Sequence, residues 1–159
     1  MTNINPVSTQ IVKPEWIDYN GNMNVAYYTM AFDYGLDEFL SKNFGMDQAY
    51  IARSQTGPFA LQSNFVYLAE LNEGEEFNIS VRIMDYTEKL IHLFSTMKRS
   101  RDNTLSATIE SLSVFVDHNT RKSTPFPQKM YEKAHTLYNI AAKEPVPEQV
   151  GQTIGIRRK

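Results

Sequence analysis

Residues 25–43 constrain the fold more than any other part of the chain, because their apolar side chains recur at the period of an α-helix. The apolar stripe of that helix consists of Val25, Tyr28, Phe32, Leu36, Phe39 and Leu40. Asn24 predicts its N-cap and Gly45 a left-handed C-cap, so the helix should span about 30 Å, a full domain diameter. Each large side chain stabilises the fold by roughly 1.5–3 kcal/mol when buried, which requires a sheet to cover the stripe.

The strands of that sheet are predicted from alternating apolar residues and the turns between them. They cover residues 8–13, 57–68, 75–86, 89–99 and 104–117, with a linker over 45–56. Strict alternation places Phe59 and Phe65 on one face of the second strand. In the last strand the apolar residues change face after Ile109, which predicts a β-bulge near Glu110 and Ser111. A second helix is predicted to begin at Pro127 and to end before Pro145.

The fold class that follows is α+β: an antiparallel sheet wrapped around a long central helix, with a C-terminal helix. The 159 residues predict a single domain over 1–143 and an extended tail over 144–159. An open sheet of this kind leaves an edge strand, and such edges are commonly protected by pairing. We therefore expect a homodimer with a continuous sheet, and the association of two dimers into a tetramer stays open.

Composition and charge exclude several classes of function. The sequence has no cysteine, which excludes disulfides and thiolate catalysis and fits a reducing compartment. It has neither a signal-peptide pattern nor a run of about 20 apolar residues, so we expect a soluble cytoplasmic protein without a membrane partner. The net charge of −2 gives no indication of a nucleic-acid partner. His92 is predicted to be structural because it stands outside any ligand spacing, and no metal is expected.

The segment 17–24, directly before the long helix, combines a carboxylate, a tight turn and a helix start. Asn20 and Gly21 both tolerate positive φ, so Asp18 should lie on a tight loop that faces the helix N-terminus. Two interpretations stay open: Asp18 merely closes an Asx-turn, or it is the carboxylate of a catalytic site.

The motif Asp18-x-x-Gly21-x-x-Asn24-x-x-Tyr27 resembles the Asp-x-x-Gly-His-x-x-Asn-x-x-Tyr signature of thioesterases of the 4-hydroxybenzoyl-CoA thioesterase group, which have the hotdog fold. The segments 16–21, 67–70, 89–94, 123–127 and 154–156 are similar to one branch, the betainyl-CoA thioesterase domains often fused behind carnitine dehydrogenase. The resemblance thus covers most of the chain. Three positions depart from it, because Asn22 replaces a His, and Gln62 and Asn64 replace a Glu and a His.

The resemblance implies a site for thioester hydrolysis without a cofactor. It assigns Asp18 as the carboxylate that activates water or attacks the carbonyl, and the backbone N–H of Val25 as the oxyanion donor. An amide cannot take a proton, so every general-base role falls on Asp18. Two interpretations of Asn22 stay open: it is a plain turn residue, or it holds water or substrate. The predicted substrate-binding residues are Trp16, Asn24, Tyr27, Gln62 and Asn64, and the predicted contacts with coenzyme A phosphates are Arg121 and Lys122. The alternative for Arg121 and Lys122 is plain solvation.

Three functions follow from the resemblance. The first is an acyl-CoA thioesterase acting on a small acyl-CoA, with betainyl-CoA as the candidate because aromatic rings attract a quaternary ammonium group. The three amides favour the second, a non-catalytic hotdog protein that binds acyl-CoA or a related ligand. The third, a hotdog dehydratase, normally needs a His near the helix, and none is there.

Overall fold

The long helix α1 (Val25–Phe44) begins and ends where its capping residues predict. In this computed structural model, which describes residues 4–158, Asn24 caps the first turn and Gly45 is left-handed with φ 64°. The buried side of α1 consists of Tyr28, Ala31, Phe32, Gly35, Phe39 and Leu40. The sequence predicts Val25 on this side, but Val25 is 59% exposed. The reason is the position of the first helical turn. Tyr28 packs on Tyr67, the last residue of its strand, so the turn that precedes Tyr28 and contains Val25 lies beyond the end of the sheet.

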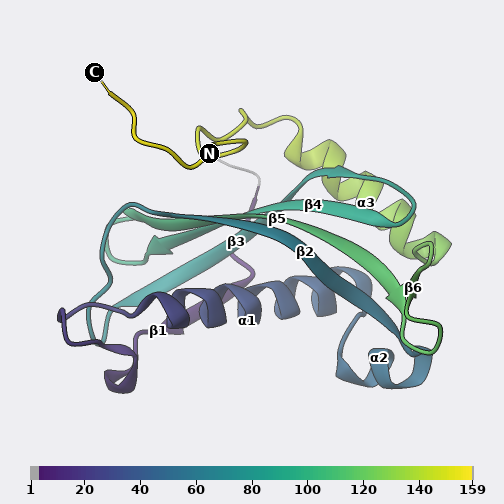
Figure 1. Cartoon of the computed structure of the whole chain (residues 1–159), viewed down its shortest axis with the longest axis horizontal. Helices are drawn as coiled ribbons and strands as arrows, with labels where there is room; N and C mark the ends of the chain where they lie inside the picture. Colours follow the sequence, from purple (N-terminus) through teal and green to yellow (C-terminus); the bar gives the residue numbers. More distant parts are fainter. Residues whose placement is uncertain (1–3, 159) are drawn as a thin grey trace.

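Within the described residues, six antiparallel strands form one sheet that curves over α1 (Figure 1). They are β1 (Ser8–Ile11), β2 (Thr56–Tyr67), β3 (Glu76–Tyr86), β4 (Leu90–Arg99), β5 (Leu105–Asp117) and β6 (Lys122–Ser123). The order is β1-β3-β4-β5-β2, with the short β6 paired to β5. The five predicted strands are confirmed to within two residues at each end.

The predicted position of the bulge in β5 is wrong. Met97 of β4 pairs with Ala107 and the next residue pairs with Leu105, which places the bulge at Ser106. The pairing continues without a shift through Glu110 and Ser111. The apolar residues change face because the second half of β5 also buries side chains on the side of the sheet away from α1.

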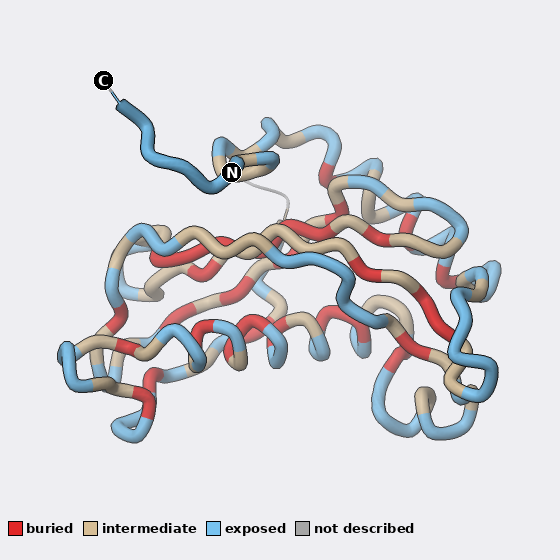
Figure 2. Tube along the Cα trace, viewed as in Figure 1, coloured by how far each residue is buried: buried red, intermediate tan, exposed pale blue. Residues whose placement is uncertain are grey.

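The sheet has an inner face on α1 and an outer face on the opposite side. The rings of Phe65 in β2 and Phe32 in α1 lie 6.2 Å apart, so Phe65 belongs to the inner face and its neighbour Asn64 to the outer face. Gly35 permits the close approach of α1 to β3, since a Cβ there would lie 2.7 Å from Ile79 Cγ2. Figure 2 shows buried residues on the sides of α1 and the sheet that face each other.

The C-terminal helix α3 (Gln128–Ala141) confirms the predicted second helix, and Pro127 is its N-cap residue. Met130 and Ala134 join the same core cluster as Leu40 near the end of α1. After α3 the chain crosses the outer face of the sheet, in the segment that the sequence predicts as an extended tail (Figure 1). Side chains of three strands hold it there, and their contacts are described below.

Two short helices complete the described chain. The 3₁₀ helix η1 (Pro14–Trp16) precedes the Asp18 loop, and α2 (Gln48–Ser54) occupies the predicted linker. Asp47 caps α2 by accepting the Tyr50 N–H at 2.7 Å. Seven residues without a buried side chain give no apolar periodicity, so the pattern does not reveal α2. No described helix is both long and apolar enough to cross a bilayer.

Candidate active site

The segment directly before α1 folds back on itself as a small hairpin. Backbone hydrogen bonds join the Asn24 N–H to the Trp16 carbonyl at 2.9 Å and the Asp18 N–H to the Asn22 carbonyl at 3.1 Å. Gly21 closes the turn with φ 82°, a conformation that favours glycine. Asp18 and Asn22 therefore lie opposite each other on a tight loop, as the turn chemistry predicts.

The Asp18 carboxylate is half-buried, and its two oxygens differ in their partners. Oδ1 accepts the Asn20 N–H at 2.8 Å, which forms the Asx-turn predicted as one alternative. Oδ2 has no hydrogen-bond partner within residues 4–158. The turn thus fixes the carboxylate while one oxygen stays available to a bound water or thioester.

The first turn of α1 follows this loop immediately. Asn24 Oδ1 accepts the Ala26 N–H at 2.9 Å, so this predicted substrate-binding side chain caps the helix. Val25 is the first helical residue, and its N–H therefore has no intrahelical acceptor. The positive end of the helix dipole presents this N–H group beside the loop.

Trp16 and Tyr27 form a stacked pair beside the loop. Their ring centroids lie 5.5 Å apart with planes at 12°, and Trp16 is only 4% exposed. Lys13 Nζ lies 5.6 Å from the Trp16 ring centroid, so this ring already has a cation partner. Trp16 also lines a cavity of about 620 Å³ between β1 and the Tyr34 side of α1.

The edge strand β2 ends beside the start of α1. Tyr67, its last residue, packs edge-on against Tyr28 with centroids 5.3 Å apart. Burial raises the pKa of both phenols, so both hydroxyls stay protonated near neutral pH. The predicted core role of Tyr28 is confirmed, but the sequence pattern does not reveal its contact with Tyr67, because the two residues lie far apart in the chain.

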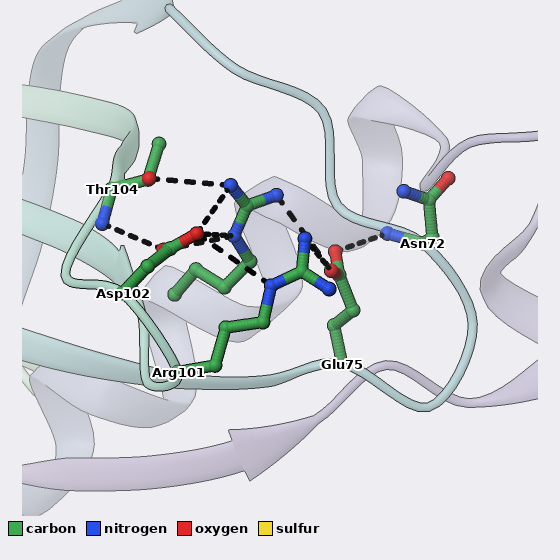
Figure 3. Close-up of polar contacts among 6 residues, drawn as sticks. Asn72, Glu75, Arg101, Asp102 and Thr104 are labelled. Carbon is green, nitrogen blue, oxygen red and sulfur yellow. Dashed lines mark hydrogen bonds and ion pairs between the residues drawn. The ribbon is translucent and has the colours of Figure 1, made fainter.

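An ionic cluster holds the segment between β2 and β3 (Figure 3). This segment contacts the hairpin, because the Met23 N–H donates to the Leu71 carbonyl. Glu75 Oε2 accepts the Asn72 N–H at 2.9 Å, and Glu75 Oε1 lies 3.1 Å from the Arg101 guanidinium. Arg99 in turn donates to Asp102 at 2.9 Å. The hydrogen bond from Arg99 holds the pKa of the Asp102 carboxyl well below its usual range.

Gln62 and Asn64 lie on the outer face, and the structure does not bring them beside Asp18 within one subunit. Both line a cavity of about 670 Å³ on that face. Asn64 Nδ2 donates to the Gln152 carbonyl at 3.0 Å, so this amide contacts the C-terminal segment. Both alternate with Phe65, which packs on Phe32 of α1, so both point to the opposite, outer face.

Arg121 and Lys122 lie at the opposite end of the subunit from the Asp18 loop. They follow β5 where it runs beside α2, and the His118 N–H donates to the Gln55 carbonyl there at 2.8 Å (Figure 1). The 20-residue α1, about 30 Å long, separates that end from Asp18. Arg121 is exposed, and its guanidinium lies 5.1 Å from the Phe59 ring centroid.

His92 has a partner that its position in the sequence does not reveal. His92 Nε2 lies 2.8 Å from Glu110 Oε1 on the neighbouring strand. The predicted structural role of this residue thus has a physical basis in a polar contact. Among the residues that the structure describes, no three His, Asp or Glu side chains are grouped as metal ligands.

Comparison with known proteins connects this geometry to a family. Residues 12–134 match the Thioesterase-like superfamily. Over 145 residues the chain is 27% identical to a betainyl-CoA thioesterase of Pseudomonas aeruginosa, and the match covers 91% of each protein. It is also 27% identical over 147 residues to an L-carnitine dehydrogenase/betainyl-CoA thioesterase of Rhizobium meliloti, covering 92% of this chain and 29% of that protein.

A solved structure extends the match to three dimensions. A hypothetical protein of Staphylococcus aureus in complex with CoA has a TM-score of 0.89 and 30% identity to this chain, and the match covers 99% of this chain and 98% of the other. The predicted hotdog-fold resemblance is therefore confirmed. Because the family match covers most of its length, the chain belongs to the thioesterase-like superfamily.

Proposed function

We propose that this protein is an acyl-CoA thioesterase that hydrolyses a small acyl-CoA thioester at the Asp18 loop. One observation carries the proposal: a carboxylate with an available oxygen is fixed on a hairpin directly before the N-terminus of a 20-residue helix. Thioester hydrolysis needs a base or nucleophile and a donor for the developing oxyanion. Asp18 and the Val25 N–H supply these two groups on adjoining segments.

In the proposed reaction, Asp18 acts on a bound water. Oδ2 accepts a proton as the water oxygen attacks the thioester carbonyl carbon, and the Val25 N–H stabilises the charge on the carbonyl oxygen. The C–S bond then breaks, and the thiolate of coenzyme A receives the proton from Asp18. Asn22, opposite Asp18, orients the water, because its amide can donate and accept hydrogen bonds without taking the proton.

We place the enzyme in a homodimer formed through β2. Among residues 4–158 this strand pairs only with β5, and its other edge is open over 12 residues. Leu61, Tyr67 and Leu68 are exposed there, and Figure 2 draws much of β2 in the colour of exposed residues. A long unpaired edge is normally protected, and pairing with β2 of a second copy would do so. The contact of Tyr67 with Tyr28 supports a site next to that interface.

The same dimer supports a role for Arg121 and Lys122 at the coenzyme A phosphates. Antiparallel pairing brings the start of one β2 beside the end of the other. Arg121 lies over Phe59 near the start of β2, so it would come to the end of the partner subunit that carries the Asp18 loop. An exposed guanidinium there is suited to bind a phosphate.

Betainyl-CoA is the proposed substrate within this class, which would place the protein in carnitine metabolism. The stacked rings of Trp16 and Tyr27 support a cationic acyl group, but Lys13 over Trp16 competes with it. The test compares kcat/KM for betainyl-CoA and its neutral isostere 3,3-dimethylbutanoyl-CoA, before and after Trp16→Ala. A preference lost in the variant supports the proposal. Equal values in the unchanged protein contradict it and leave a general short-chain thioesterase.

The second candidate function is a hotdog protein that binds acyl-CoA without hydrolysing it. The amides at Asn22, Gln62 and Asn64 favour it, since none can carry a proton. The deciding experiment measures thiol release across a panel of acyl-CoA esters, with calorimetric binding of the same esters. Release above the uncatalysed rate supports the thioesterase, whereas binding without release supports the second candidate. A cytoplasmic location is proposed on the absence of cysteine and is tested by cell fractionation.

A further inference from the structure

Two parallel rows of side chains cross the outer face of the sheet from β3 to β2. The first row, here called the held row, is Arg82, Phe94, Glu110 and Asn64. The second, the open row, is Asp85, His92, Leu112 and Gln62. Members of each row are register partners on neighbouring strands, so both rows run across the strands and end at the open edge of β2.

The held row is covered by the chain's own residues 145–152. The contacts are Arg82 donating to the Pro145 carbonyl at 2.9 Å, Glu110 accepting the Gly151 N–H at 2.8 Å and Asn64 donating to the Gln152 carbonyl at 3.0 Å. Phe94, in the middle of the row, is 1% exposed. The C-terminal segment is therefore fixed along the row and reaches the open edge strand at Asn64.

Thr153 and Ile154 still line the outer cavity of about 670 Å³, and beyond them the chain stands away from its own sheet (Figure 1). Residues 153–158, here called the arm, carry two alternate isoleucines, Ile154 and Ile156, which are 97% and 84% exposed. Arg157 and Arg158 follow them. Two large apolar side chains at alternate positions fit a segment that lies extended on an apolar surface.

The open row offers such a surface. It forms the floor of the outer cavity of about 670 Å³, in which Leu90 and Leu112 supply an apolar middle. The row begins at Gln62 on the open edge and ends at the exposed carboxylate of Asp85. Its charge is thus complementary to the two arginines at the end of the arm.

We propose that two copies of this chain exchange arms, each arm lying along the open row of the partner subunit. An antiparallel β2 pair centred on Ser63 opposes Asn64 to the partner's Gln62, so the held row of one subunit continues into the open row of the other. The open row crosses four strands about 4.8 Å apart, or about 14 Å in all, and six extended residues reach about 20 Å. The arm can therefore place its isoleucines over the partner's Leu112 and its arginines near the partner's Asp85.

Engineered disulfides test this arrangement, since the chain has no cysteine of its own. Ile156→Cys and Leu112→Cys are made in separate chains and co-expressed, so that a disulfide between the two sites must join two subunits. We expect a covalent heterodimer under mild oxidation, identified by non-reducing electrophoresis and mass spectrometry. The matched control pairs Ile156→Cys with Ser41→Cys, an exposed position on α1, and should give at least tenfold less of this product.

A second experiment measures the dimer dissociation constant of variants without engineered cysteines. The double variant Ile154→Ser with Ile156→Ser should raise the dimer dissociation constant at least tenfold. Val146→Ser, at another exposed apolar position of the C-terminal segment, should leave it unchanged. An unaltered dissociation constant in the double variant, or cross-linking no greater than in the control, overturns arm exchange.

This inference rests on the proposed dimer and not on the proposed hydrolysis. If light scattering reports a monomer, both the proposed dimer and the proposed arm exchange are contradicted, while thiol release can still be measured. If the protein is a dimer but the two engineered cysteines do not cross-link, only the proposed arm exchange is contradicted.

Discussion

Met23 donates its N–H to the Leu71 carbonyl at 2.9 Å, and this bond ties the Asp18 hairpin to the segment between β2 and β3. Leu71 is fully buried, and Glu75 holds the same segment through the ionic cluster of Figure 3. The position of the proposed catalytic carboxylate thus depends on residues that are remote from it in the sequence. A local turn fixes the shape of the hairpin, and a tertiary contact fixes its place.

Asp18→Asn should lower kcat/KM for acyl-CoA hydrolysis by at least about 100-fold, because it removes the proposed base. The melting temperature should stay nearly unchanged, since the new amide oxygen can still accept the Asn20 N–H. Steady-state kinetics and calorimetry measure the two effects. Asp33→Asn, at an exposed position of α1, serves as the control and should retain activity. Turnover of Asp18→Asn at the unmodified rate would place the chemistry elsewhere.

Asn22→His should preserve or raise activity. The position lies on a loop opposite Asp18, and an imidazole there adds a group that can carry a proton near neutral pH. The measurement is kcat and KM across pH 5–9. If KM is unchanged and kcat falls, the native amide has a role of its own in holding the water.

Arg121→Gln should raise KM for an acyl-CoA by about three- to tenfold, as expected for losing one exposed charge-assisted contact with a phosphate. KM for the matching acyl-pantetheine thioester, which lacks the nucleotide, should not change. Arg53→Gln on α2, at the same end of the subunit, is the control. Equal shifts with both thioesters would contradict a phosphate contact.

Ser63→Asp should weaken the dimer at least about tenfold, because pairing centred on Ser63 opposes this residue to its own copy and places two carboxylates together. Added salt should recover part of the loss. Ser63→Thr, which suits a strand, should leave the dimer intact. Light scattering at micromolar concentration should report a dimer for the unmodified protein, and a monomer would refute the proposed interface.

Asp102 should contribute to stability in a pH-dependent way. The hydrogen bond from Arg99 lowers its pKa in the folded protein below the usual 3.8. A depressed pKa stabilises the fold above about pH 3.8, and this contribution is lost as pH falls through the lower folded value. Asp102→Asn should therefore lower the melting temperature at pH 6 and lower it less as pH falls below about 4. Glu73→Gln, which changes an exposed carboxylate in the loop before β3, is the control. If Asp102→Asn lowers the melting temperature equally at every pH, the stabilising role of the Asp102 carboxylate is contradicted.

The sequence predicts those features that local chemistry decides. Asn24 and Gly45 mark the ends of α1 because capping depends on residues within one helical turn. The Asp18 hairpin follows from the Asn20-Gly21 turn for the same reason. The strand positions follow from alternation, and the family match is already present in the motif that begins at Asp18.

Tertiary pairing decided the rest, because the face on which a strand side chain lies depends on register. A shift between Ala60 and Gln62 pairs Phe59 with Val114 and Phe65 with Ile109, so these two phenylalanines lie on opposite faces despite their apolar alternation. Alternation puts Gln62 and Asn64 on the face opposite to Phe65, but only the packing of Phe65 on Phe32 of α1 decides that this face is the outer one, away from Asp18. A one-residue change of register turns every later side chain to the other face, and only the partner strand fixes where that change occurs.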